Sequence, residues 1–537
     1  MNPWETIATR IASAARVGVG ANLPQGLIAE LHPFGMDSWV KIVDLLNAQS
    51  CPKAALCILD AAAHRFGESA MLDVRRAVVY RELQDHVKLE VAARAALARA
   101  PDMVGAAMLL AESFRERAKT HAAATCLSTC LTRPAVLADA MRVYPCLKFI
   151  GECDEWAIVD RVGSTAIDLS PWFHPLRELQ AKAALILGKF AEAGNQYRWL
   201  ISNAPPSAGA AAAMGLALSK KFTEATDPDR SLVDDLAGRV TAGPMLASVE
   251  FARAKMSDDL QDYTGAARYL RKANAHAAQT SLWNYQRWHA FHARARRSRF
   301  PVRQRIGANE PTVVFVVGLP RSGTTLLSER LTRDRAIVTR GELNFVQYFH
   351  EQLDGAAEGE LTDLIERSAF DYLTHLIRDT ERASIYIDKN PMNFLFIDWI
   401  VAAFPNSKIV ACNRHPADLA LSLWFQYFES PLTSFSHDFN AIAAVMRSFN
   451  DITRFWSKRT QILHVNYEDL VENEDREIAR VLSYIGFTQT GNHSPKKSVP
   501  TSIATSSLWQ ARQPIYAGSI GRYHRYLDYI PELGEFL

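Results

Sequence analysis

The sequence predicts two parts of different fold class, an all-α array of helical repeats and then an α/β domain with a central parallel sheet. The chain has 537 residues, and a single hydrophobic core stops growing at about 250–300 residues. From about residue 40 to residue 285, alanine and leucine recur at three- and four-residue spacing, as is typical of helices. After Pro311, short β-branched runs alternate with helical segments, which indicates βαβ units.

The composition is that of an ordinary folded protein. It is 48% hydrophobic and 22% charged, with a formal net charge of +2, so it does not point to a disordered chain or to a nucleic-acid partner. The segment from Met1 to Val17 lacks the continuous apolar stretch of a secretion signal. No window approaches the ~20 apolar residues that cross a bilayer. We therefore expect a cytoplasmic protein without a membrane span.

The seven cysteines are odd in number and contain no C-x-x-C pair. Most lie at apolar helical positions, which favours reduced core thiols over disulfides or zinc ligands. No metal site is expected.

The first domain, residues 1–285, carries turn signals at a nearly constant interval. Four prolines close successive helices, and their spacings of 33, 37 and 34 residues bracket the 34-residue period of helix-turn-helix repeats: Pro101, Pro134, Pro171 and Pro205. An ordinary helical domain with chance proline spacing is the alternative.

The segment from Leu179 to Pro205 resembles the tetratricopeptide (TPR) pattern. Ala181 lies on its first helix and Gly188 at the turn, and three residues lie on the second helix: Ala193, Tyr197 and Leu200. TPR-like repeats would leave a concave surface for a partner.

Residues 286–304 form a predicted basic helical linker. Seven arginines lie between Arg287 and Arg305, with histidines and aromatic residues among them. A nucleic-acid site is one interpretation. A solvated basic helix that joins the two domains is preferred, because the whole chain is nearly neutral and charge runs are usually exposed faces.

The second domain, residues 305–537, contains five candidate strands. In an open α/β sheet, ligands bind outside the carboxyl ends of the strands, so the polar residues that follow these strands should converge on one crevice. The candidates are Thr312–Val317, Ala336–Thr339, Ile385–Ile387, Lys408–Cys412 and Ile462–Val465.

The first candidate strand runs into the loop Gly318–Thr325, and a helix follows. Such a turn gathers backbone N–H groups around an anion, so the loop looks like a P-loop. The lysine of nucleotide triphosphatases is absent. Arg321 supplies the cation instead, and its fork suits a terminal phosphate or sulfate. Asp388 is a candidate for the carboxylate that magnesium-dependent enzymes need. The other anion-binding candidates in the loop are Ser322, Gly323, Thr324 and Thr325.

A second anion site is predicted after residues 408–412. Arg414 lies at the carboxyl end of that strand, Pro416 suits the first position of a helix, and Ser422 falls two turns further on. An arginine and a hydroxyl together would recognise a dianion. A surface salt bridge is the alternative role for Arg414.

Taken in order, these motifs resemble the P-loop sulfotransferases, especially the protein-tyrosine sulfotransferases and the bacterial enzymes with an N-terminal TPR region. The Gly318–Thr325 loop is similar to the family's 5′-phosphosulfate loop, and Asn413–Asp418 with Ser422 resembles its 3′-phosphate motif. The resemblance implies an enzyme that moves a sulfuryl group from 3′-phosphoadenosine 5′-phosphosulfate (PAPS) to the hydroxyl of a peptide tyrosine, a polysaccharide or a metabolite.

The resemblance also implies cofactor contacts nearer the C-terminus. Tyr467 matches the tyrosine of the family's Y-E-D-L segment, and three residues fall in segments similar to the family's lid over the cofactor: Ser507, Gln510 and Arg522. A lysine corresponds to Arg522 in the animal enzymes. Gln426 stands where a second arginine for the 3′-phosphate is expected, which leaves that contact weaker or supplied by another residue.

Two residues at strand ends match the family's catalytic groups. The resemblance assigns Glu342 as the general base and Lys389 as the cation beside the leaving phosphate, which are the roles that an in-line transfer requires. His350 and His415 are alternative bases, because histidine is the commoner choice.

Two other classes of function stay open at this point. One is a TPR scaffold whose second domain binds nucleotide without catalysis, and the other is a kinase, which the missing loop lysine disfavours. The expected partner is the acceptor, presented by the repeats, and a homodimer is compatible with the sequence. A chain that begins near Pro301 should keep nucleotide binding and lose activity on a macromolecular acceptor.

Overall fold

The computed structural model describes residues 3–16, 25–241, 243–297, 299–307, 309–334, 336–379, 383–428, 430–487 and 517–537. The chain divides into two compact units, Met1–Leu179 and Gln180–Leu537. The predicted domain boundary at residues 286–304 does not coincide with this division, because the later repeat helices belong to the same unit as the sheet.

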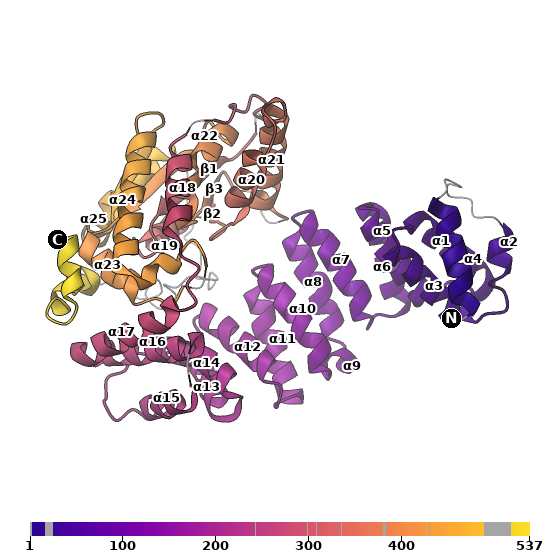
Figure 1. Ribbon diagram of the computed structural model, residues 1–537, viewed down its shortest axis with the longest axis horizontal. Helices are drawn as coiled ribbons and strands as arrows, with labels where there is room; N and C mark the ends of the chain where they lie inside the picture. Colours follow the sequence, from indigo (N-terminus) through magenta and orange to yellow (C-terminus); the bar gives the residue numbers. More distant parts are fainter. Residues whose placement is uncertain are drawn as a thin grey trace. The chain divides into compact units, whose positions relative to one another are not determined.

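The described part of the first unit is helical (Figure 1). Successive helices pack in pairs, α3 with α4, α5 with α6, α7 with α8 and α10 with α11, as expected for helical repeats. The helices are α1 (Pro3–Arg16), α2 (Gln25–Ala29), α3 (Met36–Ala48), α4 (Pro52–Phe66), α5 (Ala70–Glu82), α6 (His86–Arg99), α7 (Val104–Glu116), α8 (Thr120–Leu131), α9 (Pro134–Leu137), α10 (Ala140–Glu152) and α11 (Trp156–Leu169), and α12 (His174–Ile186) crosses into the second unit.

The repeat prolines lie where helices end. Pro101, Pro171 and Pro205 follow the ends of α6, α11 and α13 (Phe190–Asn203), and Pro134 opens α9. A proline has no N–H to continue a helix and fits its first turn. The predicted helical repeats are therefore confirmed.

The second unit begins with further repeat helices. Tyr197 of α13 packs on Gly215 of α14, where an added Cβ would lie 2.3 Å from the tyrosine ring. Gly188, at the turn before α13, has φ +77°, a conformation that glycine adopts at no steric cost. This is the TPR-like packing predicted for the Leu179–Pro205 segment. The helices that follow are α14 (Pro206–Leu218), α15 (Pro228–Arg239), α16 (Pro244–Asp259) and α17 (Tyr263–Ala278).

Helix α18 (Tyr285–Ala295) covers most of the predicted linker. Trp288, Phe291 and Ala295 are buried on one face of it. The Trp288 Nε1–H donates to Ser448 Oγ on α24 (Phe439–Trp456) over 2.9 Å. The predicted connecting helix is thus not solvated on every side: its aromatic face belongs to the core, whereas Arg287, Arg296 and Arg297 are exposed.

A five-stranded parallel sheet forms the centre of the second unit, in the order β2-β3-β1-β4-β5. The central strand β1 is buried over all but its first residue, as a strand covered on both faces should be. The five predicted strands are confirmed to within a residue at each end. They are β1 (Thr312–Gly318), β2 (Ile337–Thr339), β3 (Ile385–Asp388), β4 (Lys408–Asn413) and β5 (Ile462–Asn466).

Helices connect and cover these strands (Figure 1). Besides α18 and α24, they are α19 (Thr324–Leu331), α20 (Phe345–Asp354), α21 (Leu361–Ile377), α22 (Ile397–Ala403), α23 (Pro416–Trp424), α25 (Tyr467–Glu472) and α26 (Glu474–Tyr484), with 3-10 turns η1 (Glu358–Glu360), η2 (Pro391–Phe396), η3 (Ser434–His437), η4 (Ala517–Ser519), η5 (Arg522–Arg525) and η6 (Pro531–Phe536).

Two further expectations concern the chain as a whole. Within the described ranges, no helix combines the length and the apolar character that crossing a bilayer requires. Five of the seven cysteines are buried, as predicted for core thiols.

Candidate active site

The carboxyl ends of the strands lie at one edge of the sheet, because all pairings are parallel. The loop from Leu319 follows β1, Lys389 follows β3, Arg414 follows β4 and Tyr467 follows β5. The topology thus brings residues from four predicted motifs to the same edge.

The loop after β1 turns through two residues of positive φ, Arg321 at +74° and Gly323 at +101°. An added Cβ on Gly323 would lie 2.8 Å from Cδ2 of Tyr467, and one on Gly318 would lie 2.9 Å from the Cys412 carbonyl. Both glycines therefore permit close packing that a side chain would prevent. The loop leads directly into α19, so the first N–H groups of that helix adjoin it.

Ser322 is 1% exposed, and its hydroxyl has no hydrogen-bond partner among the described residues. Leaving a buried hydroxyl unsatisfied costs about 1–3 kcal/mol. A phosphate or sulfate oxygen in the loop would accept this hydrogen bond. Ser322 and the adjoining start of α19 therefore fit an anionic group, which is the group that the sequence predicts here.

The two predicted anion motifs contact each other. Arg321 Nε donates to Ser422 Oγ on α23 over 3.1 Å, and Ser422 is 5% exposed. The loop after β1 and the helix after β4 therefore share one hydrogen bond between their candidate ligands.

Arg414 lies among these residues. Its Nη1 donates to the Arg321 carbonyl over 3.1 Å and its Nη2 to the Ser519 carbonyl over 2.8 Å. Its guanidinium stacks over the Tyr467 ring at 4.5 Å, and burial lowers its pKa. These contacts differ from the surface salt bridge considered as the alternative, and they connect Arg414 directly to the loop.

The two predicted catalytic residues contact each other. Lys389 Nζ and Glu342 Oε1 are 2.5 Å apart, with the lysine side chain 3% and the glutamate side chain 42% exposed. The Lys389 N–H donates to the Gly341 carbonyl over 2.9 Å, so the backbone next to Glu342 extends the pairing of β3. The Glu342 carboxylate is therefore both accessible from solvent and paired with the buried ammonium of Lys389.

Asp388 precedes this lysine but belongs to the core. Its Oδ2 accepts hydrogen bonds from Tyr372 Oη at 2.7 Å and Asn393 Nδ2 at 3.1 Å. Burial raises the pKa of Asp388 to about 7. Among the described residues, no three histidine, cysteine or carboxylate side chains group as metal ligands would. A role for Asp388 as a magnesium ligand is not supported, since the residue is fully buried and Tyr372 and Asn393 already bond its Oδ2.

The two alternative bases are engaged elsewhere. His350 is 2% exposed, and its Nε2 lies 3.2 Å from Asp398 Oδ2. The ring of His415 stacks on Tyr523, with centroids 4.9 Å apart and planes 2° from parallel. His350 is a core residue, whereas the Glu342 side chain is 42% exposed.

The predicted C-terminal contacts have different outcomes. Ser507 and Gln510 lie outside the described residues. Arg522 forms an ion pair of 2.8 Å with Asp258 of α16. Sequence reasoning missed Ser519, whose Oγ lies 2.6 Å from the Tyr467 hydroxyl. No motif in the sequence marked Ser519. Asp258 was missed as well, because it lies in the repeat helices, far from Arg522 in sequence.

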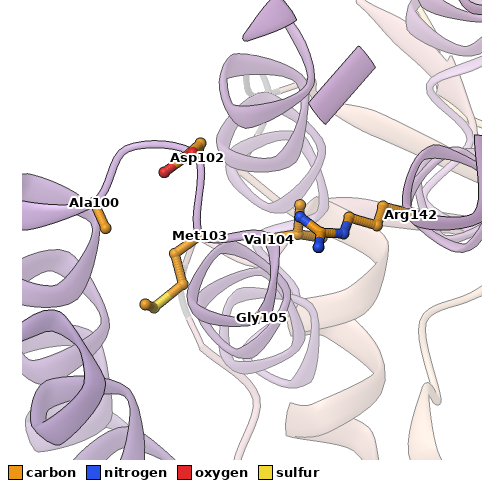
Figure 2. A pocket seen from close by; sticks show the side chains of 6 residues that line it. All are labelled: Ala100, Asp102, Met103, Val104, Gly105 and Arg142. Atoms are coloured by element: carbon orange, nitrogen blue, oxygen red, sulfur yellow. The ribbon is translucent and has the colours of Figure 1, made fainter. Parts of the chain in front are cut away.

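A separate hollow lies in the first unit (Figure 2). Its volume is about 420 Å³, and it contains none of the predicted site residues. The residues that line it are Ala100, Asp102, Met103, Val104, Gly105 and Arg142.

A parallel sheet whose first strand leads through a glycine-containing loop into a helix defines an α/β domain. Residues 311–490, which contain all five strands of the sheet, match the model of the sulfotransferase family.

Known proteins resemble parts of the chain. An uncharacterised protein of Aquifex aeolicus is 27% identical over 324 residues, which are 54% of this chain and 41% of that protein. The nodulation protein NoeE of Sinorhizobium fredii is 28% identical over 219 residues, which are 34% of this chain and 51% of NoeE. The chain thus spans about half the length, or less, of these relatives. The crystal structure of sulfotransferase STF1 from Mycobacterium tuberculosis aligns with 13% identity and a TM-score of 0.24, over 54% of this chain and 99% of that one.

Proposed function

We propose that this protein transfers the sulfuryl group of PAPS to an acceptor hydroxyl. PAPS carries anionic groups at the 5′ and 3′ positions of one ribose, so its binding site needs two neighbouring anion subsites. The observation that carries the proposal is the 3.1 Å contact between Arg321 and Ser422. It joins a loop suited to the 5′-phosphosulfate with a helix suited to the 3′-phosphate, inside a region of the sulfotransferase family.

The proposed chemistry uses the paired residues Glu342 and Lys389. The Glu342 carboxylate takes the proton of the acceptor hydroxyl while the acceptor oxygen bonds to sulfur. The bond between sulfur and the 5′-phosphate oxygen breaks, and the electron pair stays on that phosphate. Lys389 neutralises the charge that develops there, as cations do in the related phosphoryl transfers. The exposed position of Glu342 and the buried position of Lys389 support this division of roles.

The acceptor in this proposal is the hydroxyl of a peptide tyrosine, a polysaccharide or a metabolite, and the helical repeats present it. The proposed reaction takes place in the cytoplasm and uses no metal ion. The residues proposed to hold PAPS are Arg321, Ser322, Gly323, Thr324, Thr325, Arg414, Ser422, Tyr467, Ser507, Gln510 and Arg522.

Isothermal titration of the full chain tests the donor. We expect adenosine 3′,5′-bisphosphate to bind without magnesium, and ATP with magnesium to bind at least tenfold more weakly, because a 3′-phosphate ligand and not a triphosphate fits the two subsites. A preference for ATP with magnesium would refute the assignment and favour a kinase.

A further inference from the structure

The segment Ser519–Tyr526, called the strap here, contacts two residues of the proposed 3′-phosphate site. The Ser519 carbonyl accepts the hydrogen bond of Arg414 Nη2 at 2.8 Å, and Ser519 Oγ lies 2.6 Å from the Tyr467 hydroxyl. Tyr467 in turn lies under the Arg414 guanidinium at 4.5 Å. The position of Ser519 therefore orients both side chains.

Helix α23 holds the middle of the strap. The N–H groups of Gly521 and Tyr523 donate to the two carboxylate oxygens of Asp418 at 2.7 and 3.0 Å. Asp418 is 2% exposed, so these are charge-assisted hydrogen bonds in a largely dry setting.

The repeat helix α16 holds the far end of the strap. Asp258 Oδ2 pairs with Arg522 Nη2 at 2.8 Å, and Asp258 Oδ1 accepts from the Tyr526 hydroxyl at 2.5 Å. Tyr526 is fully buried, and the Arg522 guanidinium lies over the Phe425 ring at 4.2 Å. A single carboxylate of the repeats thus bonds two side chains of the strap.

We infer that Asp258, a residue of the helical repeats, is a positioning residue for the 3′-phosphate subsite. Asp258 fixes Arg522 and Tyr526, the strap carries Ser519, and Ser519 orients Arg414 and Tyr467. The inference rests on the proposed function, because it concerns the ligand proposed for Arg414. It gives the last repeat helices a part in donor binding as well as in acceptor presentation.

The test uses Asp258→Asn in the full chain, with isothermal titration. The asparagine keeps the shape and an acceptor for Tyr526 but removes the charge opposite Arg522. We expect the Kd of adenosine 3′,5′-bisphosphate to rise about tenfold, the range of one hydrogen bond to a charged group. Adenosine 5′-phosphate lacks the group that this subsite holds, so its Kd should stay within twofold.

Glu532→Gln is the matched control. It breaks the 2.8 Å ion pair between Arg271 of α17 and Glu532, which also joins a repeat helix to the C-terminal segment but lies outside the strap. Both Kd values should then remain within twofold of wild type. If Asp258→Asn does not fold, Tyr526→Phe removes the hydrogen bond to Asp258 from the side of the strap and carries the same expectation.

The outcomes separate two failures. If the wild type does not bind the bisphosphate, the proposed function fails. If the wild type binds it and the variant loses affinity for both ligands equally, or for neither, the function stands and Asp258 is only structural. A second readout is the Asp258→Asn, Ser519→Ala double variant. It should lose clearly less affinity than the sum of the single losses, because both changes act on one chain of contacts.

Discussion

At the scale of single residues, the ion pair between Glu342 and Lys389 connects the two roles that are proposed for these residues. The Glu342 Oε1 lies 2.5 Å from the Lys389 ammonium, and a cation at this distance makes the carboxylate a weaker base. A phosphate beside the lysine offers the ammonium another anion. Donor binding would thereby release the base, which links the two proposed roles.

Replacing Glu342 by glutamine tests the base. Glutamine keeps the size and hydrogen bonding but cannot accept a proton, so turnover should fall by roughly 10²–10⁴. The Kd of adenosine 3′,5′-bisphosphate should stay within tenfold, since other residues hold the nucleotide. The measurement is the rate of label transfer from sulfur-labelled PAPS. Turnover near that of wild type would move the base elsewhere.

Asp388 gives a prediction for stability against pH. Its pKa is raised to about 7 in the folded protein, whereas an aspartate in an unfolded chain titrates near 4. The folded state therefore holds a proton that the unfolded chain releases. This contribution to stability is fully present below about pH 4 and is lost as the pH rises through about 7. Asp388→Asn has no such titration. From pH 5 to pH 8, the free energy of unfolding of the wild type should therefore fall by on the order of 2–3 kcal/mol relative to that of Asp388→Asn.

Urea unfolding of both proteins at pH 5 and pH 8 measures this difference. A constant gap between wild type and Asp388→Asn would mean that the carboxyl does not titrate in this range.

At the scale of elements, the turn from β1 to α19 sets the site. Its strand was predictable because a central parallel strand is a continuous β-branched run, and its loop because glycine and serine follow that run. The partners of the loop were not predictable. Ser422 and Arg414 reach it only through the pairing of β1 with β4, and the register of strands far apart in sequence is set by packing.

In helix α18 the sequence-based prediction missed a buried apolar face. The number of arginines led to a solvated linker, yet Trp288, Phe291 and Ala295 repeat at three- and four-residue spacing and are buried. That spacing indicates one apolar helix face. The signal was present, but the charge run outweighed it.

Gly323→Ala tests the geometry of the loop. The residue has φ +101°, and a Cβ would lie 2.8 Å from the Tyr467 ring. We expect a stability loss of about 1–3 kcal/mol and at least a tenfold weaker affinity for adenosine 3′,5′-bisphosphate. Thermal unfolding and titration measure both effects. Gly355→Ala is the control, because Gly355 has φ −89° at the end of α20 and its Cβ would meet the nearest atom only at 4.0 Å. Equal behaviour of the two variants would contradict the account of the loop.

At the scale of the whole molecule, the repeat pattern predicted helices correctly, but packing decides which of them belong with the sheet. Asn274 of α17 donates to the Trp424 carbonyl at 3.0 Å, and its Oδ1 lies 2.9 Å from His437 Nδ1. Trp456 donates to the Ala295 carbonyl at 2.7 Å. Such contacts between distant segments leave no trace in local periodicity, so the sequence alone could not place this division of the chain.

Two truncated chains test the division. A chain that begins at Ser170 keeps all of α12 and the second unit. It should unfold cooperatively and bind adenosine 3′,5′-bisphosphate with a Kd within threefold of that of the full chain.

A chain that begins near Pro301 loses the buried Trp288 and Phe291, and removing one such aromatic side chain from a core costs about 3–5 kcal/mol. We expect it to be unfolded, in contrast to the expectation from the sequence. Circular dichroism melts and titration provide the readout. Cooperative melting of the Pro301 chain would restore the sequence-based boundary.

The most direct test of the central claim is transfer itself. The purified full chain is incubated with sulfur-labelled PAPS and a lysate of its own host, with a heat-treated sample of the protein in parallel. We predict that an acceptor fraction becomes labelled in the sample with active protein and not in the heat-treated one. The amount of adenosine 3′,5′-bisphosphate formed should equal the amount of label transferred. Binding of the bisphosphate without any labelled acceptor, across protein, polysaccharide and small-molecule fractions, would contradict sulfuryl transfer and leave a nucleotide-binding scaffold.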